Sequence, residues 1–289
     1  MFLQFIINGL IMGSIYSIVA LGFALVYNTT RIFHISYAAL YIAAPYFLLT
    51  FYSKFGMPFL MAFVLAVFST VIIGLLIELV IYKPLVRKNS SSNIIMISSI
   101  GVMIIIINMI ALIYGNETKI INPDISKTVR FGQLIVTYTQ LIQLLVCSLI
   151  IIVFLAFLKF SRFGIRTRAM RDDNELCSVF GMDIQRMRII LFSLSTVFCA
   201  VGGGLVAWDV GMDPYVGMPM LLNAVVALII GGVGRFEAPI LGGYIIGILQ
   251  SLSVFMFSAR WQDAVTFTLL ILFLLLRPQG ILGEKKRAV

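Results

Sequence analysis

The most constraining feature of this sequence is a series of long apolar runs that a water-soluble fold could not bury. Apolar residues make up 61% of its 289 residues and charged residues only 11%, whereas a globular exterior needs far more polar surface. About 20 apolar residues in a helix cross roughly 30 Å of hydrocarbon. Candidate spans lie at about 3–27, 33–53, 59–82, 93–114, 138–158, 188–208, 217–233, 239–257 and 263–276.

These runs are rich in Ile, Val and Phe, but in lipid each segment must satisfy its own backbone hydrogen bonds, so long runs become helices. A β-barrel would alternate polar and apolar residues, and this sequence does not. We therefore expect an all-α integral membrane protein, a polytopic bundle of about 8–9 transmembrane helices that forms a single membrane domain over residues 1–289. The segment at 217–233 is short and could be re-entrant.

The basic residues indicate the orientation of the chain. The net charge of +9 does not indicate nucleic-acid binding, because the cations occupy short gaps between apolar runs, as in cytoplasmic loops. The three basic clusters are Lys83, Arg87 and Lys88; Lys159, Arg162, Arg166, Arg168, Arg171, Arg186 and Arg188; and Arg277, Lys285, Lys286 and Arg287. Nine spans place all three inside, the loop near 115–137 outside, the N-terminus outside and the C-terminus in the cytoplasm.

The sequence contains no pattern typical of catalysis, metal binding or ATP binding. Its three cysteines form no C-x-x-C pair, and it has one histidine. It has no P-loop, no G-x-S-x-G and no H-E-x-x-H. We therefore expect no enzyme activity, no catalytic residue, no metal site and no cofactor bound by this chain.

Glycines are concentrated in the apolar runs. Gly9 with Gly13 and Gly243 with Gly247 form two G-x-x-x-G motifs, which favour close helix packing in lipid. The denser clusters 202–204 and 231–234 suggest a bend or a discontinuous helix, a device by which transporters expose backbone groups to a substrate path.

Polar side chains inside the spans are costly and therefore informative. They are Asn8, Asn108, Gln143, Asn223 and Gln250, with His34 near the start of the second span. Each one either bonds a neighbouring helix or faces a translocation path.

The basic loop at 159–188 also predicts a short helix from Asp172 to Phe180. Asp172 or Asp173 would complement the dipole at its start and Gly181 would end it. Its apolar positions, Met170, Leu176, Val179 and Phe180, favour docking on a soluble partner over a solvated connector.

Several segments together resemble one family, the LivH-type permeases of branched-chain amino-acid ABC importers. They are NGLIMGSIYSIVALGFALVY, RAMRDDNELCSVFGMD, LLNAVVALIIGGVGRFEAPILGGYIIG and RPQGILG, in this order over nearly the whole chain. The chain departs from the family where His34-Ile35-Ser36-Tyr37-Ala38 replaces a common Asn-Phe-Ala-His-Gly run, which affects the substrate assignment if that run lines the path.

The resemblance implies a permease subunit in the bacterial plasma membrane that moves substrate by alternating access. ATP would be used by two separate cytoplasmic ATPase subunits, which would contact a coupling segment at about 159–187. An extracytoplasmic binding protein and a second, different permease chain would complete the importer. The implied coupling residues are Arg168, Arg171, Asp172, Asp173, Glu175, Leu176, Phe180 and Gly181. The candidate path residues are Asn8, His34, Tyr37, Asn223, Gly231, Gly232 and Gly234.

Two alternatives stay open at this point. One is a urea- or amide-type permease of the same family, which the short length disfavours. The other is an autonomous secondary carrier or channel, for which the scarcity of intramembrane acids is unusual.

Overall fold

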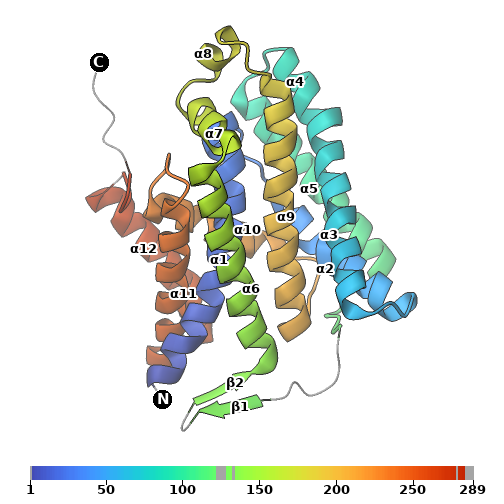
Figure 1. Ribbon diagram of the computed structural model, residues 1–289. Coiled ribbons are helices and arrows are strands. Elements are labelled where there is room, and N and C mark those ends of the chain that lie inside the picture. The colour runs from blue at the N-terminus through green and yellow to red at the C-terminus, as the bar shows by residue number, and fades with distance from the viewer. Residues whose placement is uncertain (1, 122–127, 132–133, 278, 284–289) are drawn as a thin grey trace. The chain divides into compact units, whose positions relative to one another are not determined.

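The computed structural model describes residues 2–121, 128–131, 134–277 and 279–283, most of which are helical (Figure 1). The α-helices are α1 (Phe2–Thr30), α2 (Tyr37–Leu49), α3 (Phe59–Leu76), α4 (Lys83–Arg87), α5 (Ser92–Tyr114), α6 (Tyr138–Phe160), α7 (Arg162–Asp172), α8 (Asn174–Val179), α9 (Ile184–Val210), α10 (Gly217–Gly231), α11 (Ala238–Met256) and α12 (Gln262–Leu276). Two π-helical segments, η1 (Thr50–Lys54) and η2 (Ile77–Tyr82), and a 3-10 turn, η3 (Ala259–Trp261), extend some of them. Strands β1 (Thr128–Phe131) and β2 (Leu134–Thr137) form an antiparallel hairpin.

All nine apolar runs form helices, which confirms the all-α polytopic class. Among the described residues, seven helices are long and apolar enough to cross a membrane: 2–30, 59–87, 92–114, 138–160, 184–210, 238–256 and 259–276. The α10 helix has 15 residues, which corresponds to about 22 Å and is shorter than the hydrocarbon core.

The chain folds into two compact units, each assembled from separate stretches of sequence. Unit 1 contains 1–24, 124–156 and 222–289, and unit 2 contains 25–123 and 157–221. The single-domain assignment over 1–289 stays a prediction. The cations Lys285, Lys286 and Arg287 of the predicted third basic cluster lie outside the described residues.

The core of unit 2 is built around α2, which packs against α3, α5 and α9. Almost every residue of α2 is buried, as expected for a helix that is apolar on all sides. Pro45 lies inside α2, and because proline has no amide hydrogen, the carbonyl of Tyr41 loses its helical donor. The backbone of Gly203 on α9 approaches that carbonyl so closely that a β-carbon would collide with it.

This packing corrects one prediction for the glycine clusters. The 202–204 cluster does not interrupt its helix, because α9 runs without a break from Ile184 to Val210. All three glycines are buried, and Gly204 packs against the ring of Phe63. They permit close helix contact in unit 2.

The second glycine cluster does interrupt the helices of unit 1. The chain leaves α10 at Gly231 and enters α11 at Ala238, and Gly232 and Gly234 have φ of +122° and +106°. Such backbone angles are readily adopted only by glycine. The C-terminal segment at 279–283 closes over this turn, since the amides of Ile281 and Leu282 donate to the carbonyls of Ile230 and Gly231, each at 2.8 Å.

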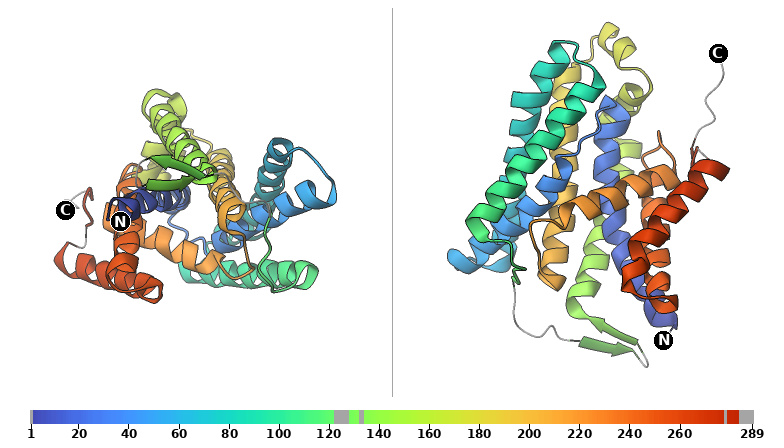
Figure 2. Two further views of the ribbon diagram at one scale, coloured as in Figure 1. Left: turned by 90° about the horizontal axis from the view of Figure 1, so that it is seen from below. Right: turned by 180° about the vertical axis from the view of Figure 1, so that it is seen from behind.

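The two G-x-x-x-G motifs pack on each other in unit 1. A β-carbon at Gly9 would lie 2.7 Å from the Cα of Ile248, and one at Gly247 would lie 2.5 Å from the Cα of Gly13. The helices α1 and α11 therefore cross at backbone distance, which confirms the packing role predicted for both motifs. Figure 2 shows α12 running beside α11 in the same unit.

Two predicted basic clusters meet at one end of unit 2. Figures 1 and 2 show α4, α7 and α8 at that end, and Arg87 donates to Gln185 at 3.3 Å. At the other end of α9, Lys119 pairs with Met212 in a β-bridge. The described part of the loop predicted to lie outside is therefore remote from the basic clusters within this unit.

Candidate functional site

The predicted coupling segment contains two helices rather than one. The predicted helix is confirmed as α8, whereas α7 before it was not predicted. Asp173 separates them in an extended conformation. Its carboxylate accepts from the amides of Glu175 and Leu176 at 2.8 and 2.9 Å. Asp173, and not Asp172, is thus the N-cap that organises α8.

Gly181 ends α8 as predicted. Its φ is +78°, its amide donates to Ser178 at 3.0 Å, and the Met182 amide donates to Cys177 at 3.1 Å. This pair of bonds is the Schellman arrangement, which satisfies the last carbonyls of a helix and favours glycine at this position. Short local signals at both ends therefore define α8.

Two arginines of α7 form contacts at the turns that precede and follow this helix. Arg168 donates to the carbonyl of Leu158 at 2.6 Å and so caps the end of α6. A β-carbon at Gly164 would collide with the same carbonyl, so this turn requires glycine. Arg171 pairs with Asp172 at 2.7 Å. These contacts fix the direction in which α7 leaves α6.

The apolar side chains of α8 form an exposed surface, which we call the α8 face and define as Leu176, Val179 and Phe180. Their exposed fractions are 54%, 80% and 80%. Met170 does not belong to this face, contrary to expectation, because it lies on α7 and is 1% exposed. Glu175 is exposed beside the face. An apolar surface on so short a helix is typical of a protein contact.

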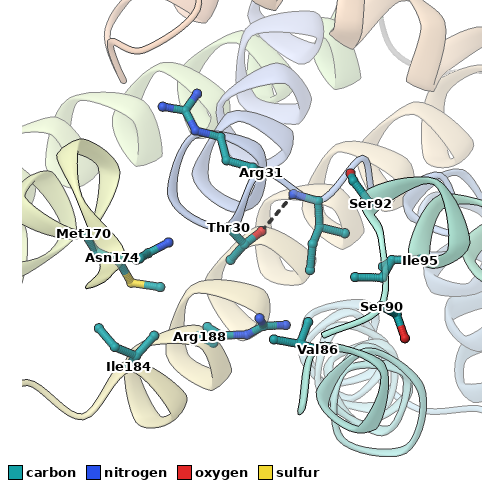
Figure 3. A pocket seen from close by; sticks show the side chains of 11 residues that line it. Thr30, Arg31, Val86, Ser90, Ser92, Ile95, Met170, Asn174, Ile184 and Arg188 are labelled. Carbon is teal, nitrogen blue, oxygen red and sulfur yellow. Dashed lines mark hydrogen bonds between the residues drawn. The ribbon is translucent and has the colours of Figure 1, made fainter. Parts of the chain in front are cut away.

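A cavity of about 350 Å³ lies beneath α7 and α8 (Figure 3). Its lining includes Met170, Asn174, Ile184, Val86 and Arg188. Asn174, the first residue of α8, donates to the carbonyl of Thr29 at 2.7 Å, and its buried side-chain oxygen has no hydrogen-bond partner among the described residues. The predicted coupling segment is thus attached to the end of α1, and a cavity remains beside this attachment.

A buried ion pair lies beside this cavity. Arg188 on α9 donates to Glu78 on η2 through Nε at 2.9 Å and Nη2 at 3.2 Å, and the two residues are 8% and 2% exposed. Bidentate geometry makes such a pair strong and directional. The pair joins the first turns of α9 to the π-helical end of α3.

Unit 1 contains a polar groove between α1 and α11, which we call the α1–α11 groove. Its volume is about 230 Å³. Its lining residues recur at helical spacing on α1 and α11 and include the first residue of α12: Phe5, Asn8, Met12, Tyr16, Gly247, Gln250, Ser251, Val254 and Gln262. The crossing of the two glycine motifs forms its floor at Gly247. The path candidate Asn8 therefore lines an actual cavity.

Four helices of unit 1 meet beside this groove in a network that we call the Gln250 cluster: Tyr16, Asn223, Gln250 and Thr266. Tyr16 donates to Gln250 Oε1 at 2.7 Å, while Gln250 Nε2 donates to Asn223 at 3.2 Å and to Thr266 at 2.7 Å. The path candidate Asn223 thus lies behind Gln250. Sequence analysis missed Tyr16 and Thr266, because neither residue type is unusual in a membrane helix.

The path candidate His34 lies in a closed network of unit 2 that we call the His34 cluster: His34, Ser36, Tyr82 and Ser99. The Tyr82 hydroxyl lies 2.8 Å from His34 Nδ1, 2.8 Å from Ser36 Oγ and 2.7 Å from Ser99 Oγ. All four residues are at most 1% exposed. Tyr37 is equally buried, and its hydroxyl donates to the carbonyl of Ser195 at 3.4 Å.

The three path candidates among the glycines form the turn after α10. Gly231 and Gly232 contact the C-terminal segment, whereas a β-carbon built on Gly234 would have open space around it, as far as the described residues beyond its chain neighbours are concerned. The other polar residues of the spans are separate: Asn108 is exposed on α5 and donates to Ile104, whereas Gln143 is buried.

No group of three or more His, Cys, Asp or Glu is placed to hold a metal among the residues that the structure describes. Burial raises the pKa of the Cys177 thiol, and the carboxylates of Asp173 and Asp172 raise it further. The thiol therefore stays protonated at neutral pH and is a weak nucleophile.

Similarity to known proteins extends over nearly the whole chain. The family model described as "Branched-chain amino acid transport system / permease component" matches residues 5–274. The high-affinity branched-chain amino acid transport system permease protein LivH of Escherichia coli is 30% identical over 298 residues, covering 98% of this chain and 96% of LivH. The corresponding protein BraD of Pseudomonas aeruginosa is 28% identical over 297 residues, with the same coverage.

A solved structure shares the fold. One chain of PsaBC from Streptococcus pneumoniae, solved in complex with a Fab, aligns with a TM-score of 0.54. The alignment covers 96% of this chain and 92% of that chain at 16% sequence identity. At this identity the likeness is one of fold.

Proposed function

Because the chain belongs to the branched-chain amino acid transport permease family, we propose that it is the membrane-spanning subunit of an ATP-driven importer of branched-chain amino acids. Its nearly full-length similarity to LivH and BraD supports this substrate class. The chain would perform no chemistry itself. It would provide a passage that alternates between the two sides of the membrane.

We further propose that the α8 face is where an ATPase subunit docks. The observation that carries this proposal is the exposure of Leu176, Val179 and Phe180 on a helix whose ends are both fixed by caps. A rigid helix with an apolar face can insert into a groove of a soluble protein. Arg168 and Arg171 would hold α7 and so orient α8, whereas Glu175 would lie at the rim of the contact.

The proposed orientation follows from this role. An ATPase is cytoplasmic, so the end of unit 2 that carries α4, α7 and α8 would face the cytoplasm, in agreement with its positive charge. The N-terminus would then lie outside and the C-terminus inside. A second permease chain and an external binding protein would complete the importer.

We assign the α1–α11 groove to the translocation path. Its lining combines uncharged amides and hydroxyls with apolar side chains, which suits weak and transient contact with an apolar amino acid delivered by a binding protein. The His34 cluster and the glycine turn would support the path from outside it.

The docking proposal is tested by placing a charge on the α8 face. Leu176→Asp and Phe180→Asp should each reduce ATP-driven leucine uptake by at least tenfold in proteoliposomes that contain the complete importer, because an unpaired carboxylate would be buried in the contact. ATP hydrolysis by the same preparation should no longer respond to the binding protein. Val210→Asp is the matched control, since Val210 is 68% exposed at the opposite end of α9.

Unchanged uptake in both α8 variants would refute the docking role. Leucine flux through the purified chain without ATPases would instead identify an autonomous carrier and refute the importer assignment.

A further inference from the structure

A second cavity lies in unit 2 between the α3–α4 junction and the start of α9, and nothing in transport itself requires it. Its volume is about 230 Å³. Its lining combines cations, one acid and apolar side chains: Glu78, Lys83, Val86, Arg87, Ile184, Gln185, Arg188 and Ile189. We propose that this cavity binds the headgroup of an anionic phospholipid.

The cavity has a net positive charge that can interact with an anionic ligand. Glu78 is engaged by both nitrogens of Arg188, so the two charges cancel within the wall. Among the described residues, neither Lys83 nor Arg87 forms an ion pair with a carboxylate. Arg87 donates to Gln185 at 3.3 Å, which leaves its charge uncompensated. The lining therefore holds three cations and one carboxylate, and this excess of positive charge matches a phosphate group.

The surroundings of the cavity indicate that the ligand is a lipid. Apolar side chains are exposed beside it on η2 and α9, with Leu79 40%, Val80 66% and Ile190 43% exposed. A surface of this kind faces acyl chains when the helices stand in a bilayer. Lys83 begins α4 directly after η2, so the cations lie where the spanning helix ends, at headgroup level. Basic pockets between helices at that level bind anionic lipid headgroups.

The chain provides a close control for non-specific charge. Lys88 is exposed next to Arg87 but does not line the cavity. Lys88→Gln therefore removes the same charge from the same segment without touching the proposed site. If a headgroup binds in the cavity, replacing the cavity cations should weaken lipid binding more than replacing Lys88. If lipid binds to a diffuse positive surface, the two changes should have equal effects.

The test measures lipid retention by the purified full-length chain in native mass spectrometry, with phosphatidylglycerol titrated against phosphatidylcholine. The wild type should retain one phosphatidylglycerol in preference to phosphatidylcholine. The double variant Lys83→Gln/Arg87→Gln should bind it about 25-fold more weakly, since each cation near an anionic lipid contributes about fivefold. Lys88→Gln should stay within about twofold of the wild type.

Two further variants keep the proposal falsifiable if the double variant folds poorly. Lys83→Arg/Arg87→Lys keeps both charges and should retain the lipid, whereas Ile189→Trp fills the cavity without changing charge and should lose it. An equal loss in Lys88→Gln and the double variant would overturn the proposal. So would displacement of the lipid by millimolar inorganic phosphate, which would make the site an anion site without a lipid anchor.

Discussion

The Gln250 cluster and the His34 cluster are both hydrogen-bonded networks within apolar helices, yet of the two only the Gln250 cluster shares residues with one of the three cavities described above. Tyr16 and Gln250 line the α1–α11 groove in unit 1 and are 7% and 6% exposed. The residues of the His34 cluster in unit 2 are at most 1% exposed. None of its buried side-chain nitrogens or oxygens lacks a partner.

The difference between the clusters teaches that a polar residue in a membrane helix does not by itself mark a substrate path. Satisfied polar groups inside a helix bundle hold helices together. Polar groups that border a cavity can also exchange partners with water or substrate. The same tyrosine-to-phenylalanine change should therefore have different consequences in the two clusters.

Tyr82→Phe should have the largest effect on stability. It removes a hydroxyl that contacts three polar groups of the His34 cluster and leaves them without water to replace it, at a cost of about 2–3 kcal/mol. Denaturant unfolding of the purified protein measures this loss, and uptake per folded molecule should not change. Tyr52→Phe, in the same unit, is the control. A loss below that of the matched unit 1 variant would contradict the closed character of this cluster.

Met12→Trp should have the next largest effect, on transport. Met12 lines the α1–α11 groove, and the larger ring would occupy part of its volume, so uptake should fall by about tenfold, equivalent to about 1.4 kcal/mol. Initial rates in proteoliposomes measure the change. Leu3→Trp adds the same bulk to an exposed residue of the same helix that does not line the groove. Equal uptake rates in the two variants would show that the groove is not part of the translocation path.

Tyr16→Phe should cost about 1 kcal/mol of stability. It removes one hydrogen bond, to Gln250 at 2.7 Å, and water in the adjacent groove can bond the freed oxygen. Unfolding under the conditions used for Tyr82→Phe gives a direct comparison. If Tyr16→Phe proves as costly as Tyr82→Phe, the groove is closed to water and the contrast between the clusters fails.

Asn8→Ala should have the smallest effect. The side chain accepts one bond from Gln4 at 3.2 Å, so stability should change by less than about 0.5 kcal/mol. Loss of one polar contact to a passing amino acid should lower uptake about threefold, which corresponds to a typical net hydrogen bond. Leu3→Ala controls for truncation on the same helix. A change in stability without a change in uptake would make Asn8 a packing residue.

The helices and the α8 caps were predictable because their signals are local. Apolar length defines the spans, and Asp173 and Gly181 define α8 through bonds to residues two to five positions away. The α7 helix was missed because it has no long apolar pattern, although its start also carries a local signal: the hydroxyl of Ser161 accepts from the amide of Gly164 at 3.0 Å and caps the helix. Met170 was wrongly assigned to an exposed face because its burial against the cavity beneath α7 depends on segments that are distant in sequence.

The glycine clusters show where prediction from sequence ends. Gly203 and Gly232 occur in equally dense clusters, but Gly203 lies in an unbroken helix because the carbonyl of Tyr41 packs against it. Gly232 forms a turn because the C-terminal segment closes on it. Neither partner is close in sequence, so local pattern could not distinguish packing from interruption.

By itself, the sequence determined that this protein is a polytopic helical membrane protein of the permease family and that a capped helix interrupts its basic loop, because apolar length, charge position and capping act over short stretches of chain. Only the tertiary structure decided which polar residues meet. Tyr16 and Gln250 are 234 positions apart, and the groove lies between the two helices that carry them. A cavity exists only where packing leaves space between such distant segments.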